Sequence, residues 1–250
     1  MRKLLLAATA LTVSSSAFAG PPPAPGFNWT GCYLGGNIGP GWGNANFSNS
    51  TTIAATETDA VNAGSGVGVL GGGQIGCNLQ VGQNWIFGAE GDFGWSSISG
   101  TTPDPFFDGK NLSSRTDWIA SATGRVGYAF NNWMFYGKGG AAWAGNRYGF
   151  SSGPIMFEGF TISPAFNETG ANTAFGGTAG GGVEWSFAPG WSARVEVDYY
   201  GFSPRTLTLF DPTSGMSSGP VRVRQDIEAI RFGFNYQFWS GGGWLFGKNW

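Results

Sequence analysis

The sequence predicts an all-β protein, an eight-stranded antiparallel transmembrane up-and-down β-barrel, and three observations predict it. Glycine makes up 45 of 250 residues and aromatic residues 16%, whereas charged residues are only 11%. Stretches in which apolar and polar residues alternate recur along the chain. The connections between these stretches are alternately short and long, and short turns at one end with long loops at the other are typical of outer-membrane barrels.

Bulk composition excludes several other classes of protein. The mean hydropathy of −0.09 argues against a bundle of apolar membrane helices and fits strands in which only alternate residues are apolar. The net charge of −2 gives no reason to expect nucleic acid binding. The chain has no histidine, the commonest general base and metal ligand. We therefore expect no enzyme, no catalytic or metal site and no cofactor; a two-carboxylate site is the remaining catalytic alternative.

The N-terminus, residues 1–19, reads as a signal peptide. Arg2 and Lys3 precede an apolar run at residues 4–13, and Ala17-Phe18-Ala19 is a small-x-small cleavage site. The alternative, a membrane anchor, is too short to span. Residues 20–29 are predicted to be a periplasmic Pro-rich spacer. After Ala19 no apolar run reaches the ~20 residues that a spanning helix needs, so an exported chain that crosses a membrane must cross as strands.

Residues 30–238 are predicted to form the barrel. Its closing stretch alternates strictly, with Ile230, Phe232 and Phe234 on one face and Arg231 and Gly233 on the other, which is the period of a β-strand. Short turns are expected at residues 81–84, 131–132 and 188–190, and long polar loops at 44–65, 98–115, 149–172 and 203–225. The eight expected strands are residues 30–43, 66–80, 85–97, 116–130, 133–148, 173–187, 191–202 and 226–238.

Aromatic residues recur at the ends of the outward faces. Trp85 and Trp95 are ten residues apart, as are Trp133 and Trp143. At ~3.3 Å per residue and ~45° tilt this spacing spans roughly 23 Å, close to the ~25 Å apolar band of such barrels. The predicted aromatic girdles are Trp85, Trp95, Trp118, Phe130, Trp133, Trp143, Phe175, Phe187, Trp191, Tyr199 and Phe238.

Charged residues fall on the opposite, inward face. Counting residues from the short-turn rim puts acids beside bases, and we expect three pairs: Glu90 with Arg125, Glu184 with Arg194, and Asp198 with Arg231. An eight-stranded barrel is just wide enough for side chains to fill it, which favours a plug of ion pairs. The alternative is a narrow conduit, with the inward glycines at 68, 72, 76, 176, 180 and 182 leaving free space. The predicted lumen network is Glu90, Asp92, Arg125, Lys138, Glu184, Arg194, Glu196, Asp198 and Arg231.

The two cysteines, Cys32 and Cys77, have outward parity near the short-turn rim of consecutive strands. An exported protein permits a disulfide, and we hypothesise a bridge between the first two strands. The alternative is two lipid-facing thiols.

Three motifs carry a resemblance to a known family: residues 27–43, FNWTGCYLGGNIGPGWG; residues 71–80, GGGQIGCNLQ; and the closing IRFGFNYQF. The chain resembles the small outer-membrane barrel proteins of alphaproteobacteria, the opacity-type porin-like family, similar to the transmembrane domain of outer-membrane protein A. The resemblance implies a monomer in the bacterial outer membrane. Members are described as envelope-stabilising proteins, weak porins, surface antigens and haem binders, and no residue here stands out as a haem ligand.

The chain departs from that family at its end. Such barrels usually finish on the aromatic that the barrel assembly machinery recognises, a role that Phe238 fits, but residues 239–250 follow and are predicted to be a C-terminal tail. The alternatives are a ninth strand and a displaced aromatic terminus at Trp250. We expect a non-enzymatic envelope-integrity protein with weak porin activity as an addition. The alternative is a surface receptor or adhesin acting through four long loops. The expected partners are outer-membrane lipid, lipopolysaccharide and the assembly machinery.

Overall fold

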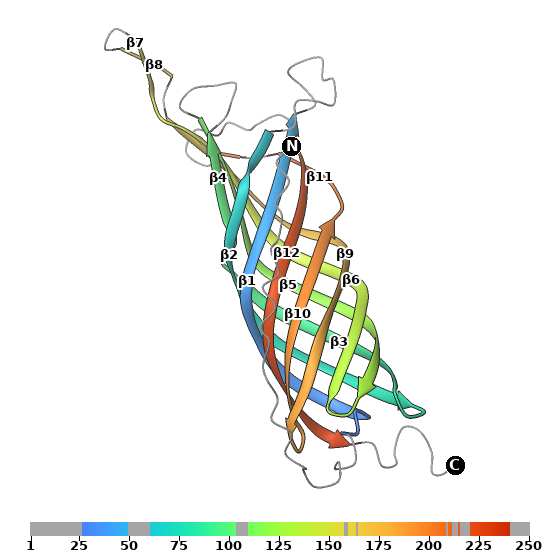
Figure 1. Ribbon diagram of the computed structural model, residues 1–250. Helices are drawn as coiled ribbons and strands as arrows, with labels where there is room; N and C mark the ends of the chain where they lie inside the picture. The colour runs from blue at the N-terminus through green and yellow to red at the C-terminus, as the bar shows by residue number, and fades with distance from the viewer. Residues whose placement is uncertain are drawn as a thin grey trace, which may run out of the picture.

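The structure is a computed structural model that describes residues 27–49, 61–103, 110–157, 160–163, 165–208, 210–211, 215 and 221–240. Eight long strands pair in the ring order β1, β2, β3, β5, β6, β9, β10 and β12, and β12 pairs with β1, which closes the sheet into a barrel (Figure 1). Every neighbouring pair is antiparallel. The predicted eight-stranded up-and-down barrel is confirmed. No helix of the described residues is long and apolar enough to span a membrane.

The barrel strands are β1 (Gly31–Asn49), β2 (Val61–Val81), β3 (Trp85–Ser96), β5 (Lys110–Phe130), β6 (Trp133–Ser152), β9 (Phe166–Ala188), β10 (Trp191–Phe202) and β12 (Val221–Ser240). Four short strands lie at the long-loop end. β4 (Ser99–Pro103) pairs with β5, β11 (Arg205–Leu207) pairs with β12, and β7 (Ile155–Phe157) forms a hairpin with β8 (Phe160–Ser163).

The strands run further than predicted at the long-loop end. Residues 44–49, 61–65, 110–115, 149–152, 166–172 and 221–225, predicted to be loop, are strand. Their polar composition concealed a continuing alternation, in which Ala45, Leu112, Tyr148 and Val223 point inward and pack into a small buried cluster. The barrel therefore extends as a paired sheet beyond its outer girdle, and the predicted short turns lie at the opposite end (Figure 1).

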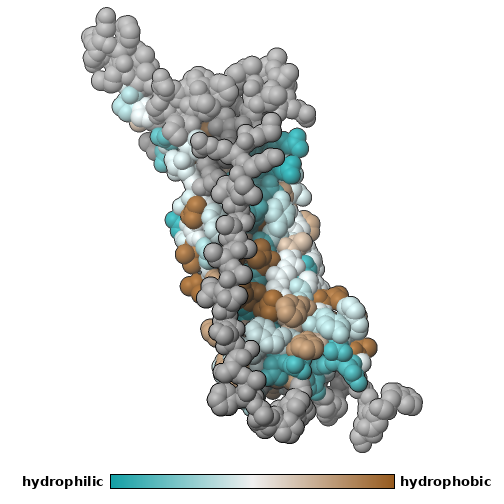
Figure 2. Space-filling view, viewed as in Figure 1, coloured by the Kyte–Doolittle hydropathy of each residue, from teal (hydrophilic) through white to brown (hydrophobic). Residues whose placement is uncertain are grey.

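The outward face of the wall is apolar between two aromatic belts. All eleven predicted girdle residues have exposed or partly exposed side chains. Neighbouring rings pack against each other, as for Trp133 and Trp185, whose centroids are 5.7 Å apart, and for Trp143 and Phe175, at 5.6 Å. Figure 2 shows hydrophobic side chains over the middle of the visible wall and hydrophilic ones near its two ends. This distribution suits a wall that faces lipid.

Cys32 and Cys77 form a disulfide and are direct register partners on β1 and β2. We expect no mass shift when the unfolded protein is alkylated without reductant, and a shift of two alkyl groups would contradict the bridge. The bridge closes a segment with a sequence separation of 45. Replacing both cysteines with serine should lower the free energy of unfolding by about 2–4 kcal/mol, measured by urea denaturation in vesicles.

The ends of the chain lie mostly outside the described residues, including the predicted signal peptide at 1–19 and residues 241–250 of the predicted tail. Trp239 and Ser240, predicted to begin that tail, are instead the last two residues of β12 and pair with β1. Phe27 and Trp29, the last part of the predicted spacer, are described. Trp29 is only 3% exposed and packs with Ile86, Ala129 and Met134 in the short-turn mouth of the barrel. This segment is thus part of the barrel interior.

Candidate functional site: the filled lumen

The lumen holds all nine side chains of the predicted charge network. Strict alternation along each strand turns them inward, and each of the nine residues is buried. They are Glu90, Asp92, Arg125, Lys138, Glu184, Arg194, Glu196, Asp198 and Arg231. Within this network, four bases therefore face five acids.

Glu90 is one centre of this network. Its carboxylate lies 3.3 Å from Arg125, 3.4 Å from Lys138 and 2.5 Å from Arg194, and it accepts a hydrogen bond of 2.7 Å from the Tyr33 hydroxyl. Arg194 is on β10 and Glu90 on β3, strands that are not neighbours in the ring. The contact therefore crosses the lumen and ties opposite walls together.

Glu196 and Asp198 form a second centre. Lys138 lies 2.7 Å from Glu196 and 3.3 Å from Asp198, and Arg231 lies 2.8 Å and 2.6 Å from the same carboxylates. Arg231 also reaches Asp92 at 3.0 Å, and the Ser121 hydroxyl donates to Asp92. Lys138 bonds to both centres, so the network is continuous.

Two of the three predicted pairs are present, Glu90 with Arg125 and Asp198 with Arg231. The third pair is adjacent in the sheet, as predicted, but does not form an ion pair. Glu184 and Arg194 face each other in register, but Glu184 pairs with Arg125 at 2.9 Å and Arg194 turns to Glu90. Guanidinium groups are long enough to cross so narrow a lumen, so register alone does not fix their partners.

Apolar layers on both sides of the charges were missed in the sequence. Towards the short-turn mouth, Trp29, Ile86, Ala129, Met134 and Tyr136 form one buried cluster. On the other side lies a larger cluster. The inward parity of Ile86 and Met134 was the available signal. The second cluster comprises Leu70, Ile98, Ile119, Ala142, Ala144, Ala174, Tyr200, Phe202, Ile227 and Ala229.

The inward glycines do not leave free space beside them, contrary to the expectation on which the conduit alternative depended. A Cβ on Gly72 would lie well within 3.0 Å of the Phe93 carbonyl oxygen, and one on Gly176 would meet the Gly201 carbonyl equally closely. At Gly76 it would strike the Tyr33 hydroxyl. A Cβ at the remaining three positions would also approach a neighbour within 3.0 Å; these are Gly68, Gly180 and Gly182. Backbone atoms of neighbouring strands and side chains of the network occupy the space that a missing side chain would leave.

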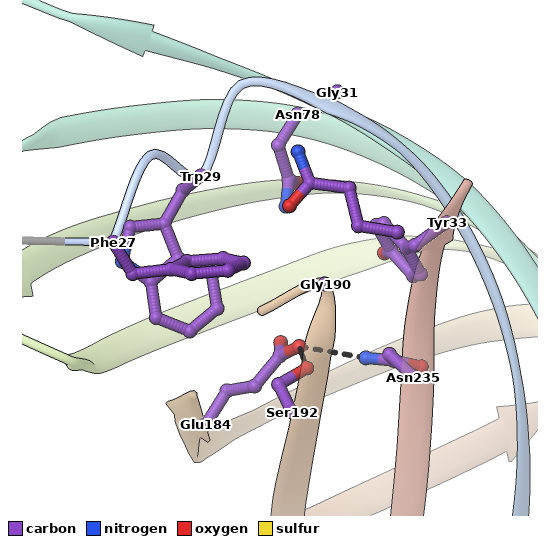
Figure 3. A pocket seen from close by; sticks show the side chains of 10 residues that line it. Phe27, Trp29, Gly31, Tyr33, Asn78, Glu184, Gly190, Ser192 and Asn235 are labelled. Carbon is purple, nitrogen blue, oxygen red and sulfur yellow. Dashed lines mark hydrogen bonds between the residues drawn. The ribbon is translucent and has the colours of Figure 1, made fainter. Parts of the chain in front are cut away.

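The short-turn mouth contains a small cavity between Trp29 and the network (Figure 3). Its volume is about 10 Å³, about the minimum that holds one water molecule. In its wall, Glu184 accepts hydrogen bonds from Ser192 at 2.5 Å and Asn235 at 2.7 Å (Figure 3). The segment that carries Trp29 and Thr30 is held by hydrogen bonds from two strands. Gln80 accepts from the Trp29 backbone N–H, and Gln237 donates to the Thr30 carbonyl.

The chemistry open to this site is limited. The network's carboxylates are engaged by cations or hydrogen-bond donors, and the described residues hold no group of three or more metal-ligating side chains. The arrangement can cross-link the wall and resist the entry of water and ions.

The sequence resembles those of known outer-membrane proteins. The family described as "Outer membrane protein beta-barrel domain" matches residues 4–238. The 31 kDa outer-membrane immunogenic protein of Brucella melitensis is 28% identical over 257 residues, covering 95% of this chain and 100% of that protein. The 22 kDa outer membrane protein of Rhizobium leguminosarum is 27% identical, covering 87% and 82%. Among solved structures, OprG of Pseudomonas aeruginosa aligns with a TM-score of 0.46 at 10% identity, covering 84% of this chain and 98% of that one.

Proposed function

The chain belongs to the outer membrane protein beta-barrel domain family and is an outer-membrane protein, and from that premise we propose that it is a non-conducting, non-enzymatic structural element of the envelope. The observation that carries this proposal is the continuous buried ion network of the lumen, bounded on both sides by apolar layers. An ion crossing this interior would have to displace paired charges and then pass layers of mainly apolar side chains, which offer few groups to replace its hydration.

Several features support a wall-building role. The closed ring leaves no unpaired edge along the spanning strands, so the backbone bonds are satisfied within lipid. The same closure supports a monomer, because no edge strand is offered to a second copy. The girdles fix the depth of the barrel. We propose outer-membrane lipid and lipopolysaccharide as its surroundings and the barrel assembly machinery as the partner that inserts it.

The conductance prediction tests the closed lumen. Purified, refolded protein in a planar lipid bilayer should give no discrete current steps, because the network and both apolar layers fill the passage. A known open porin, purified and refolded in the same way, serves as the positive control. Reproducible wild-type steps that change in a double variant, Arg125→Ala with Lys138→Ala, would establish a pore through these residues and overturn the proposal.

Surface recognition is the second candidate function. The strands extend beyond the outer girdle and carry the β7–β8 hairpin, and the Brucella relative is named an immunogenic protein. A strain lacking the gene, complemented with wild type or with a variant whose residues 153–165 are replaced by a short Gly-Ser linker, separates the two. A structural role predicts that both restore detergent resistance equally. Loss of rescue by the variant, at equal surface level, would favour recognition.

A further inference from the structure

The outer surface carries a cationic groove that the structural role does not use. It is a hollow of about 570 Å³ along the extension of β4, β5, β6 and β9, above the outer girdle. Its lining includes the hydroxyl or amide side chains of Thr101, Ser113 and Asn167, and two arginines, Arg115 and Arg147. Among the residues that the structure describes, no acidic side chain lines the groove. Its outward-pointing side chains face the surroundings of the barrel and not its lumen.

The two arginines are arranged as a pair. Arg115 on β5 and Arg147 on β6 are direct register partners, and their side chains are 61% and 70% exposed. Like charges opposite each other in a sheet are unfavourable unless an anion lies between them. Asp117 supplies one carboxylate, 3.0 Å from Arg115 Nε and 2.8 Å from Arg147 Nε.

A β-bulge brings that carboxylate into position. The register of β5 shifts between Thr116 and Trp118, so Asp117 is the extra residue of the strand. Apart from Asp117, the two arginines have no ion-pair partner among the described residues. Two guanidinium groups and one carboxylate leave a net positive charge, with the remaining donors available to a second anion.

The height of the two arginines above the outer girdle indicates which kind of anion they meet. Arg147 lies four residues beyond Trp143 of the outer girdle, which at ~3.3 Å per residue and ~45° tilt is roughly 9 Å above it. That height is the headgroup region of a bilayer. Arginine forks bind phosphate through two parallel hydrogen bonds, and hydroxyl and amide side chains suit the sugar beside it.

We propose that Arg115, Arg147 and the adjoining groove bind the phosphorylated sugar headgroup of an outer-leaflet glycolipid of the lipid A class. This inference goes beyond the proposed structural role and does not depend on it, since it would stand even if the lumen conducted ions.

Native mass spectrometry of the refolded protein in neutral detergent, titrated with bisphosphorylated lipid A, tests the site. We expect one retained lipid per barrel, and Arg115→Gln with Arg147→Gln should weaken its binding roughly twenty-five-fold, about fivefold for each arginine. Arg222→Gln with Arg224→Gln is the matched control. Arg224 lies four residues beyond Glu228, which pairs with the girdle residue Tyr199, so Arg224 is as far beyond the outer girdle as Arg147. Heat-dependent gel mobility shows that each variant is folded.

Further experiments distinguish binding at this site from general electrostatic attraction and from binding of a soluble ligand. Arg115→Lys with Arg147→Lys keeps both charges but loses the forks, and should still bind at least severalfold more weakly. Lipid A without phosphates should bind the wild-type protein as weakly as bisphosphorylated lipid A binds the glutamine variant. Equal loss in the control pair, undiminished binding of dephosphorylated lipid A, or displacement of the lipid by equimolar soluble phosphorylated glucosamine would each overturn the proposal.

Discussion

Replacing Arg125 with alanine is expected to lower the free energy of unfolding by about 3–5 kcal/mol, the cost of breaking a buried ion pair by removing one partner. The Arg125 side chain is 0% exposed and lies 3.3 Å from Glu90 and 2.9 Å from Glu184. It also lies against two rings, with its guanidinium carbon 5.3 Å from the Tyr33 centroid and 4.5 Å from that of Tyr136. Alanine would leave a cavity and a carboxylate without its cation.

Urea unfolding in lipid vesicles, followed by tryptophan fluorescence and by heat-dependent gel mobility, measures the effect. Arg147→Ala is the matched control: it removes the same side chain from a 70% exposed position and should cost less than about 1 kcal/mol. Equal losses in the two variants would contradict a role for burial.

A second variant separates charge from packing. Arg125 is the only cation within ion-pair distance of Glu184 among the described residues. Arg125→Met with Glu184→Gln removes both charges and keeps most of the volume, and replacing a whole buried pair is often nearly neutral. We expect this double variant to be more stable than Arg125→Ala by at least about 2 kcal/mol. If it is no more stable, the stranded charge is not the cause of the loss.

The direction in which each charge points could be predicted from the sequence, because the two-residue period of a strand is strict. Glu90 and Arg125, for example, point inward as their positions in the alternation require. Their partners could be predicted only in part. Register places Glu184 beside Arg194, but a long side chain in a narrow lumen reaches strands across the ring as readily as its neighbour. Which partner such a side chain takes is decided by the packing of the whole lumen.

Two other features could not be predicted from the sequence, for a different reason: how far the strands extend and whether the inward glycines leave free space. Beyond the outer girdle no lipid demands an apolar face, so the alternation weakens to a few inward residues such as Leu112 and Val223. Glycine in a strand shows only that a side chain is missing. Whether the space stays empty or is taken by another strand depends on the coiling of the barrel wall, which composition does not report.

Replacing Gly72 with alanine is therefore expected to impair assembly severely. The new Cβ would lie well within 3.0 Å of the Phe93 carbonyl oxygen and close to the Gly94 Cα, both backbone atoms of β3. A flexible side chain could move aside, but a paired backbone moves only if β2 and β3 separate and lose ladder hydrogen bonds. We expect a loss of at least about 2–3 kcal/mol, in the range of overpacking in a tight core.

Gly124→Ala provides the control for this prediction, because a Cβ there would meet nothing within 4 Å. Both variants add one methyl group to a glycine in the barrel wall, so chain entropy and strand propensity change alike. The folded fraction after refolding into vesicles, read from heat-dependent gel mobility, should fall sharply for Gly72→Ala and stay at the wild-type level for Gly124→Ala. Normal folding of Gly72→Ala would mean that β2 and β3 can move apart there, and the inward glycines would again be room that a conduit could use.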